Sequence, residues 1–301
     1  MHKGVGKKRY MKNIFLICFF LNSFFLFSLQ WPVENPVVKA NFGEKTGSYY
    51  NTGIDIISKS PDAFAVDKGE IVYYQEENNH FSALPSGLGN FIVIEHDRLL
   101  RTTYGHLDDN FIGKEKVNVA AGEVIGKIGD SGSSNGRYLH FELIDREFGE
   151  LVNPLILLPV IGDKTKPLIK EVFLKNSGSA QYKTVANNEE IKAGKYDLSA
   201  IIYDLGENMN YFYQVAPYSI KVYINGEESL SIVYNSIKKS GNHLVLSSNN
   251  RNVKDYYLDN ENWQIYLGQF DFRPGVTMIE ISVSDFKGNE IIKELKIISL
   301  R

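Results

Sequence analysis

Residues 126–143 read GKIGDSGSSNGRYLHFEL, a turn rich in glycine and serine that leads directly into a short alternating segment. Side chains two residues apart in a β-strand lie on the same face of the sheet, so Tyr138 and His140 form a same-face pair. An imidazole presented by a strand in this way is well placed to ligate a metal. The stretch therefore predicts a strand that contributes to a metal site if partners lie upstream.

Short apolar segments precede this stretch. They are rich in Ile, Val, Tyr and Phe and are bounded by Gly, Asp, Asn or Ser, which is typical of antiparallel strands joined by hairpins. The predicted strands are residues 53–57, 69–74, 90–96, 102–107, 123–128 and 138–144. Residues 75–89 show no periodicity and are expected to form a long loop, and such loops are often functional.

A second strand-rich region follows a break at Asn153, Pro154 and Pro159. Its predicted strands are residues 169–174, 195–203, 218–224, 263–272, 277–284 and 291–298. Roughly seven strands separated by turn signals such as Asn225-Gly226 favour a β-sandwich. The turn at residues 285–289 resembles those of bacterial immunoglobulin-like modules, and no clustered polar constellation is evident in this region. We therefore read it as a spacer or binding module.

The sequence thus predicts an all-β protein with four parts. Residues 1–30 form a signal peptide or N-terminal anchor, 31–160 an antiparallel β-sheet domain, 161–167 a linker and 168–301 an immunoglobulin-like β-sandwich. Lys3, Lys7, Lys8, Arg9 and Lys12 precede an apolar run at residues 14–29. That run is shorter than the ~20 residues of a typical membrane-spanning helix, so a secretory signal is favoured and an uncleaved anchor is the alternative.

The amino-acid composition argues against cysteine-based sites and against nucleic acid as a partner. The one cysteine, Cys18, lies in the N-terminal segment, so the rest of the chain has no disulfide framework and no cysteine ligands or nucleophile. Without residues 1–30 the chain has 28 basic and 36 acidic residues, a net charge of −8. An acidic surface argues against nucleic acid as a partner. We expect an exported protein of the periplasm or cell envelope that meets the membrane only through its N-terminal segment.

Five polar motifs occur in order in the first region. They are residues 51–55 (NTGID), 89–96 (GNFIVIEH), 104–107 (YGHL), 121–126 (AGEVIG) and 131–142 (SGSSNGRYLHFE). In this order and spacing they resemble the LytM or lysostaphin-type zinc metallopeptidases, which cut peptide cross-links in bacterial peptidoglycan. The resemblance covers about residues 40–157. It implies the family's antiparallel sheet, known as the duplicated hybrid motif fold.

The resemblance also assigns roles to individual positions. It implies that Asp55 and His140 stand at zinc-ligand positions and that His106 lies near the scissile bond. The remaining ligand position, a histidine in the family, is Asn51 here. The remaining catalytic position, also a histidine in the family, is Tyr138.

The two replaced histidines weaken both the zinc binding and the catalysis that the resemblance implies. A catalytic zinc takes three protein ligands and a water, and an amide oxygen suits hard cations better than zinc. Losing the imidazole should lower zinc affinity by at least about 10–100-fold, so we expect zinc binding to be weak or absent. Tyr138, with an ordinary pKa near 10, is neutral at pH 7 and cannot serve as a base. Alternatively, Asp55 and His140 now form only a hydrogen-bonded buried pair.

Three functions remain open. The chain is a catalytically impaired member of the family, a pseudoenzyme that regulates cell-wall remodelling through peptidoglycan or a cell-wall amidase. Alternatively, it is an active zinc endopeptidase in which Asn51, or His80 from the long loop, replaces the lost ligand. The third reading is a non-enzymatic peptidoglycan-binding envelope protein. On the chemistry above we expect no peptidase activity.

Overall fold

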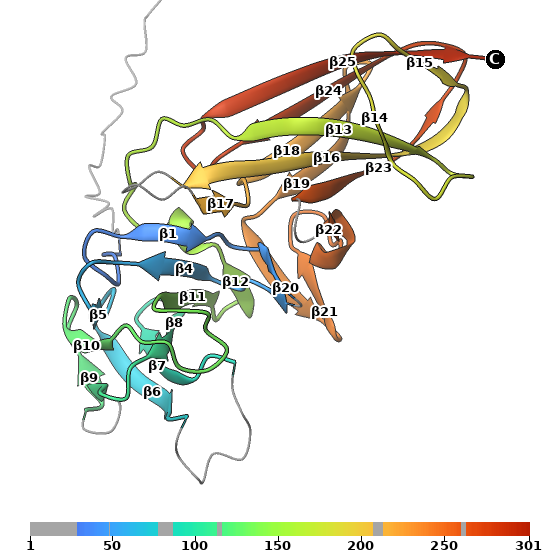
Figure 1. Ribbon diagram of the computed structural model, residues 1–301. Helices are drawn as coiled ribbons and strands as arrows, with labels where there is room; N and C mark the ends of the chain where they lie inside the picture. The colour runs from blue at the N-terminus through green and yellow to red at the C-terminus, as the bar shows by residue number, and fades with distance from the viewer. Residues whose placement is uncertain (1–28, 48, 78–86, 113–115, 207–212, 260–262) are drawn as a thin grey trace, which may run out of the picture.

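The computed structural model describes residues 29–47, 49–77, 87–112, 116–206, 213–259 and 263–301. In these residues the protein is almost entirely β-structure, with two short 3-10 helices (Figure 1). The all-β prediction is confirmed. The N-terminal basic and apolar segment, including Cys18, lies outside the described residues. Within the described part, no helix has the length and apolar character needed to cross a bilayer.

The first half of the chain contains twelve described strands and one 3-10 helix. They are β1 (Val37–Ala40), β2 (Lys45–Thr46), β3 (Tyr49–Tyr50), β4 (Ile54–Ile57), β5 (Asp62–Phe64), β6 (Gly69–Gln75), β7 (Asn90–His96), β8 (Leu100–Leu107), β9 (Asn118–Val119), β10 (Val124–Lys127), β11 (Leu139–Asp145), β12 (Glu150–Val152) and η2 (Pro154–Ile156). The main sheet runs β12-β11-β8-β7-β6-β9, and β4 pairs with both β11 and β1. All of these pairings are antiparallel, as the sequence predicts.

The second half forms two sheets that enclose a buried apolar layer. Its elements are β13 (Leu168–Asn176), β14 (Lys183–Thr184), β15 (Glu189–Lys192), β16 (Gly194–Gly206), β17 (Tyr213–Val215), β18 (Ser219–Ile224), β19 (Glu227–Val233), β20 (Ser236–Ser240), β21 (His243–Leu246), η3 (Val253–Tyr256), β22 (Tyr257–Asp259), β23 (Gln264–Phe272), β24 (Gly275–Ser284) and β25 (Glu290–Leu300). One sheet runs β14-β13-β16-β23-β22 and the other β15-β25-β24-β18-β19. This is the expected β-sandwich, and in strands such as β18 buried apolar side chains alternate with less buried ones.

One hairpin of the second half leaves the sandwich. Strands β20 and β21 extend the first half's sheet, because β20 pairs with β12 through Leu151–Ile237 and Val152–Ser236. Glu150 lies at this junction and accepts hydrogen bonds of 2.8 Å from the hydroxyls of Ser236 and Ser247. The expected linker therefore joins two regions that also share a sheet (Figure 1).

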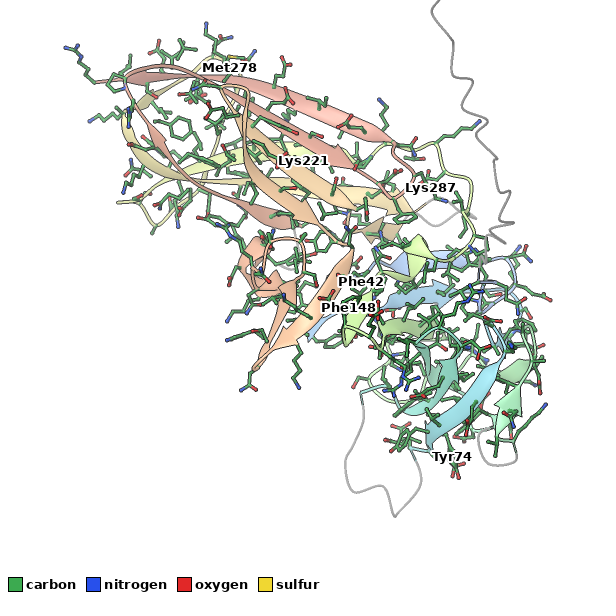
Figure 2. The ribbon with its side chains drawn as sticks, turned by 180° about the vertical axis from the view of Figure 1, so that it is seen from behind. Phe42, Tyr74, Phe148, Lys221, Met278 and Lys287 are labelled. Carbon is green, nitrogen blue, oxygen red and sulfur yellow. The ribbon has the colours of Figure 1, made fainter. Side chains whose placement is uncertain are left out.

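The two halves also share a buried core. Phe42, 1% exposed, lies where they meet (Figure 2), and the buried apolar cluster continues from one half into the other. Glu44, in the turn before β2, accepts a hydrogen bond of 3.0 Å from the Ala216 amide of the second half. Gly43 has φ +76° and packs against the ring of Tyr234, where a Cβ would approach within 2.4 Å. Glycine is required at this contact.

Candidate functional site

Three neighbouring strands bring the predicted site residues together. Strand β11 lies between β4 and β8, with His140 opposite Asp55 on one side and opposite Gly105 on the other. Residues directly opposite each other in a sheet present their side chains on one face. Gly53 allows the close approach of this segment, because a Cβ there would lie 2.1 Å from the carbonyl oxygen of Phe141.

Asp55 and His140 form a direct, buried pair. The imidazole Nδ1 of His140 donates to Asp55 Oδ1 at 2.8 Å, and both residues are 7% exposed. Glu142, two residues further along the same strand, places Oε1 3.3 Å from Nε2 of His140 without making a hydrogen bond to it. Burial opposes the charged imidazole, but hydrogen bonding to Asp55 and the charge of Glu142 outweigh it and raise the pKa of His140.

Asn51 stands at the edge of this pair with its acceptor already engaged. Its Oδ1 accepts a hydrogen bond of 3.1 Å from the Gly53 amide, and its buried Nδ2 has no hydrogen-bond partner among the described residues. The carbonyl oxygen is the atom of an amide that ligates metals, whereas Nδ2 is a donor. Asn51 therefore uses its carbonyl oxygen, the atom that could ligate a metal, in a hydrogen bond within its own segment and leaves its buried Nδ2 unpaired.

His106 is held rigidly next to Tyr138. Its backbone has φ +59°, which is uncommon outside glycine, and its Nδ1 donates to the carbonyl oxygen of Ser131 at 2.8 Å. Burial lowers the pKa of His106 and favours the neutral ring, whose Nε2 then carries the lone pair. The ring packs edge-on against Tyr138, with centroids 4.8 Å apart.

Tyr138 is also unsuited to base catalysis. Burial, together with the charge of Asp55, raises the pKa of its hydroxyl to about 12. At neutral pH the hydroxyl can donate a hydrogen bond, but its phenolate is not populated. That a tyrosine cannot replace the family's catalytic histidine stays a prediction.

A cavity of about 330 Å³ borders these side chains. Its lining includes Tyr49, Tyr50, Asn51, Asp55, Leu88, His106, Tyr138 and His140. All five positions predicted from the motifs thus face one cavity, together with two tyrosines from the β2–β3 hairpin region. The sixth candidate, His80, lies outside the described residues.

The donor set does not match a catalytic zinc site. Such a site needs three protein ligands, but only Asp55 and His140 of the family's set remain, and the Asn51 carbonyl oxygen, a poor zinc ligand, already accepts a hydrogen bond from Gly53. Among the described residues, the one group of three or more His, Cys, Asp or Glu side chains close enough to share a metal lies elsewhere. We therefore derive no step that uses zinc.

Two residues of the site are missing from the sequence-based prediction. Glu142 was detectable, since it lies two positions after His140 and so shares its face of β11. Lys39 gave no such signal. It reaches the site from β1, where its ammonium lies 4.0 Å from the centroid of the Tyr138 ring.

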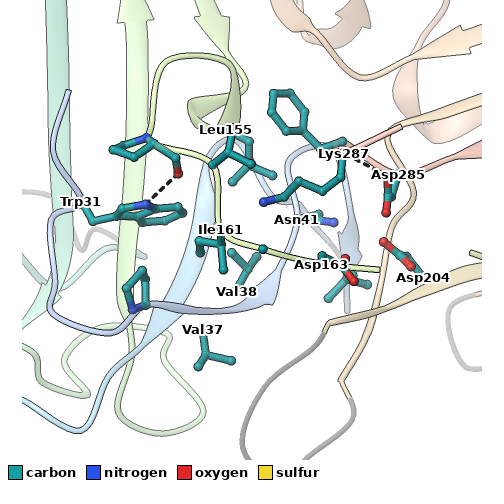
Figure 3. Close-up of a pocket in the computed structure, with 16 residues that line it drawn as sticks. Trp31, Val37, Val38, Asn41, Leu155, Ile161, Asp163, Asp204, Asp285 and Lys287 are labelled. Carbon is teal, nitrogen blue, oxygen red and sulfur yellow. Dashed lines mark hydrogen bonds between the residues drawn. The ribbon is translucent and has the colours of Figure 1, made fainter. Parts of the chain in front are cut away.

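A second polar cluster corrects the expectation of no polar constellation beyond the first region. Asp163, Asp204 and Asp285 bring carboxylate oxygens within 4.8 Å of one another at the junction of the two halves (Figure 3). Lys287 lies beside them, and although burial lowers its pKa, the charges of Asp163 and Asp285 favour the ammonium. Three short carboxylates from distant segments leave no local sequence pattern.

Comparison with known proteins identifies the first region. Residues 49–154 match the model of peptidase family M23, and a second family model without a descriptive name matches residues 166–298. Residues 49–154 are an M23-family domain. The resemblance to LytM and lysostaphin-type peptidases is thereby confirmed for this part of the chain.

Curated relatives of this chain include a hydrolase activator, a lipoprotein and an endopeptidase. Murein hydrolase activator NlpD of Escherichia coli is 38% identical over 131 residues, 43% of this chain and 31% of that protein. Outer membrane antigenic lipoprotein B of Haemophilus influenzae is 34% identical over 131 residues, 43% of this chain and 29% of that protein. DD-carboxypeptidase/endopeptidase Mpg of Neisseria meningitidis is 39% identical over 80 residues, 26% of this chain and 18% of that protein. The chain thus spans about a third or less of their lengths.

Solved structures give a partial match. The catalytic domain of the prophage-encoded M23 protein EnpA from Enterococcus faecalis is 28% identical, with 40% of this chain and 91% of that chain covered and a TM-score of 0.34.

Proposed function

We propose that this chain is an exported cell-envelope protein whose M23 domain has lost peptidase activity and regulates a cell-wall hydrolase, most directly an amidase. The observation that carries the proposal is that Asn51 and Tyr138 share one cavity with Asp55 and His140 and stand at the positions where the family has histidines. The side chains that remain are bonded to one another and leave no complete set for activating a water.

The loss of catalysis follows from two independent deficits. Hydrolysis of a peptide bond in this family needs an activated water and a proton-transfer group. Asn51 removes an imidazole from the set that would activate the water. Tyr138 removes the proton-transfer group, because its pKa of about 12 keeps it neutral. A positioned acid or base typically contributes about 10²–10⁴-fold to the rate, so the two losses compound.

The cavity supports a binding role that survives these losses. Its aromatic walls and its space of about 330 Å³ remain, although the reacting groups have changed. Concave, mostly apolar sites with a few polar groups are the usual places for ligand recognition. The cavity is therefore suited to hold a segment of peptidoglycan peptide or of a partner protein without cleaving it.

The name of one relative agrees with regulation. NlpD is named a murein hydrolase activator, and it is 38% identical to this chain over 131 residues. The basic and apolar N-terminal segment, residues 1–30, supports export to the envelope. We propose an amidase as partner, with peptidoglycan as the surface on which the two proteins meet.

Release of dye from labelled peptidoglycan tests this function. The full chain alone should release no dye, with or without added zinc, and should stimulate release by a cell-wall amidase several-fold. Tyr49→Ala, at the cavity wall, should reduce the stimulation. The matched control Val276→Ala removes a side chain that is similarly exposed, 56% against 49% for Tyr49, on strand β24 of the sandwich, and should leave the stimulation unchanged.

Two outcomes would favour the other functions. Dye release by the chain alone that a chelator abolishes would support an active zinc endopeptidase, for which the retained Asp55 and His140 are the favouring observation. Retention on peptidoglycan without any effect on an amidase would support a non-enzymatic peptidoglycan-binding protein.

A further inference from the structure

Lys39 enters the site through an irregularity in strand β1. The pairing of β1 with β4 shifts between Val38 and Ala40, so that Val38 lies opposite Ile56 and Ala40 opposite Asp55. Lys39 is the extra residue of this β-bulge. Bulges re-aim side chains and are frequent next to functional sites. Here the bulge places a lysine on the strand segment that faces Asp55.

The lysine ammonium is fixed by two contacts. Its Nζ donates to Asn135 Oδ1 at 2.7 Å and lies 4.0 Å from the centroid of the Tyr138 ring. A cation over the face of a tyrosine is attracted by the ring, and more strongly where water is partly excluded. Tyr138 thus has a second consequence beyond the loss of a base, since its ring is a platform for this ammonium.

An acidic side chain near the Lys39 ammonium helps to keep it protonated. Asp55 and Glu142 are the acidic side chains around His140, and Glu44, which keeps its proton at neutral pH, also lies near Lys39. Burial lowers the pKa of Lys39, while the nearby Asp55 acts in the opposite direction and favours the charged form. A half-buried positive charge therefore lies beside the carboxylate that would otherwise attract a metal.

We propose that Lys39 adds a second positive charge next to this site, besides the His140 imidazolium, and, held over the Tyr138 ring at the β1 bulge that pairs with Asp55, excludes a divalent cation from it. This inference rests on the proposed function, because it explains how a site without metal stays electrostatically balanced. It gives the site a further obstacle to metal binding, besides the loss of the ligand at Asn51. The exclusion is electrostatic, since two like charges close together in a medium of low dielectric repel strongly.

The inference has a specific consequence for restoring the ligand set. Asn51→His alone would return the three family ligands, His at position 51 with Asp55 and His140, while leaving Tyr138 and its contact with Lys39 intact. If Lys39 excludes a divalent ion, this variant should bind zinc weakly. Removing the lysine charge in the same background should then tighten zinc binding by at least about tenfold.

Calorimetric titration of the full chain with zinc tests this directly. Asn51→His is compared with Asn51→His/Lys39→Met, which keeps the aliphatic stem and removes the charge. The matched control is Asn51→His/Lys127→Met, which makes the same change at an exposed position of β10. We expect the Lys39→Met affinity to be at least about tenfold tighter and the Lys127→Met affinity to be within about twofold of Asn51→His.

A second variant keeps the test valid if Lys39→Met does not fold. Lys39→Gln removes the charge and retains a donor for Asn135, so it should give the same gain in affinity if Lys39→Met fails to fold. Equal affinities with and without the Lys39 charge would overturn the inference and leave the proposed function untouched. Stoichiometric zinc and hydrolysis in the unmodified chain would instead overturn the proposed function.

Discussion

At the scale of single residues, the site is a set of paired side chains around His140. The imidazole joins Asp55 on one side and approaches Glu142 on the other, and Thr52 donates to Glu142 Oε1 at 2.5 Å. Buried charges persist where they are paired and hydrogen-bonded. The remnant of the ligand set therefore contributes to the stability of the sheet.

The Asp55–His140 pair should respond strongly to truncation. Asp55→Ala leaves His140 buried without its acceptor, and breaking a buried pair in this way typically costs about 3–5 kcal/mol. Asp55→Asn keeps an acceptor oxygen for the Nδ1–H group and should cost less. Urea unfolding measures both values, with the exposed Asp271→Ala as the control. A cost below about 1 kcal/mol for Asp55→Ala would show that the pair does not hold the strands.

Back-substitution should reveal how many departures disable the site. Asn51→His/Tyr138→His restores the family's histidines but retains the Lys39 ammonium, and we expect little release of peptide from peptidoglycan. Adding Lys39→Met should produce hydrolysis that a chelator abolishes. Full activity in the double variant would show instead that only the two histidine positions matter.

At the scale of elements, the strands of the motif region were predictable because each carries its own signal. Strand β7 has the predicted bounds, and β4, β8, β10 and β11 agree within two residues, since alternation and turn residues mark them locally. The motif residues were predictable for the same reason, and their gathering around one cavity follows from the pairing of β4, β8 and β11. The roles of those residues remain predictions.

Features that depend on distant partners were not predictable. The pairing of β20 with β12 is set by tertiary packing, as Lys238 and Lys239 give the segment no strong strand signal. The bulge at Lys39 is a shift in the register of β1 against β4. Residues 37–40 contain no sequence signal that predicts it. Propensity describes the chain locally, whereas register and bulges depend on what each strand meets.

The β20–β21 hairpin should contribute measurably to stability. Ile237 is fully buried where β20 meets β12, and Ile237→Ala should destabilise the protein by about 2–4 kcal/mol through lost burial and a residual cavity. Ile292→Ala on β25, where the side chain is 51% exposed, should change stability by less than about 0.5 kcal/mol. Denaturant midpoints give both values. Equal effects would mean that the hairpin is not docked in solution.

At the scale of the whole molecule, Glu44 connects the first half of the chain to the second half. Its carboxylate accepts hydrogen bonds from the amides of Asn41 and Ala216, at 2.9 and 3.0 Å. Burial nevertheless dominates and raises the pKa of Glu44 to about 8. The folded protein therefore holds a proton on Glu44 at pH values where the unfolded chain, with a pKa of about 4.3, has released it.

The proton on Glu44 makes the free energy of unfolding decrease as pH rises. As pH rises from about 5 to 6.5, the folded state binds more protons than the unfolded state at Glu44, so this group lowers the free energy of unfolding by about 1.4 kcal/mol per pH unit. His140, whose pKa is also raised, adds a loss of the same sign only above about pH 6.5. Glu44→Gln should flatten the slope between pH 5 and 6.5, whereas Glu70→Gln, at an exposed position of β6, should not. An unchanged slope in Glu44→Gln would mean that Glu44 is ionised in the folded protein.

We propose that the M23 domain of this chain does not operate as a zinc peptidase. The most direct test of this claim is the zinc content of the unmodified full chain, purified without chelator, incubated with zinc and desalted. We predict well under one zinc per chain and no change in thermal midpoint on adding a chelator. Close to one zinc per chain, with a midpoint that falls when the metal is removed, would contradict the claim.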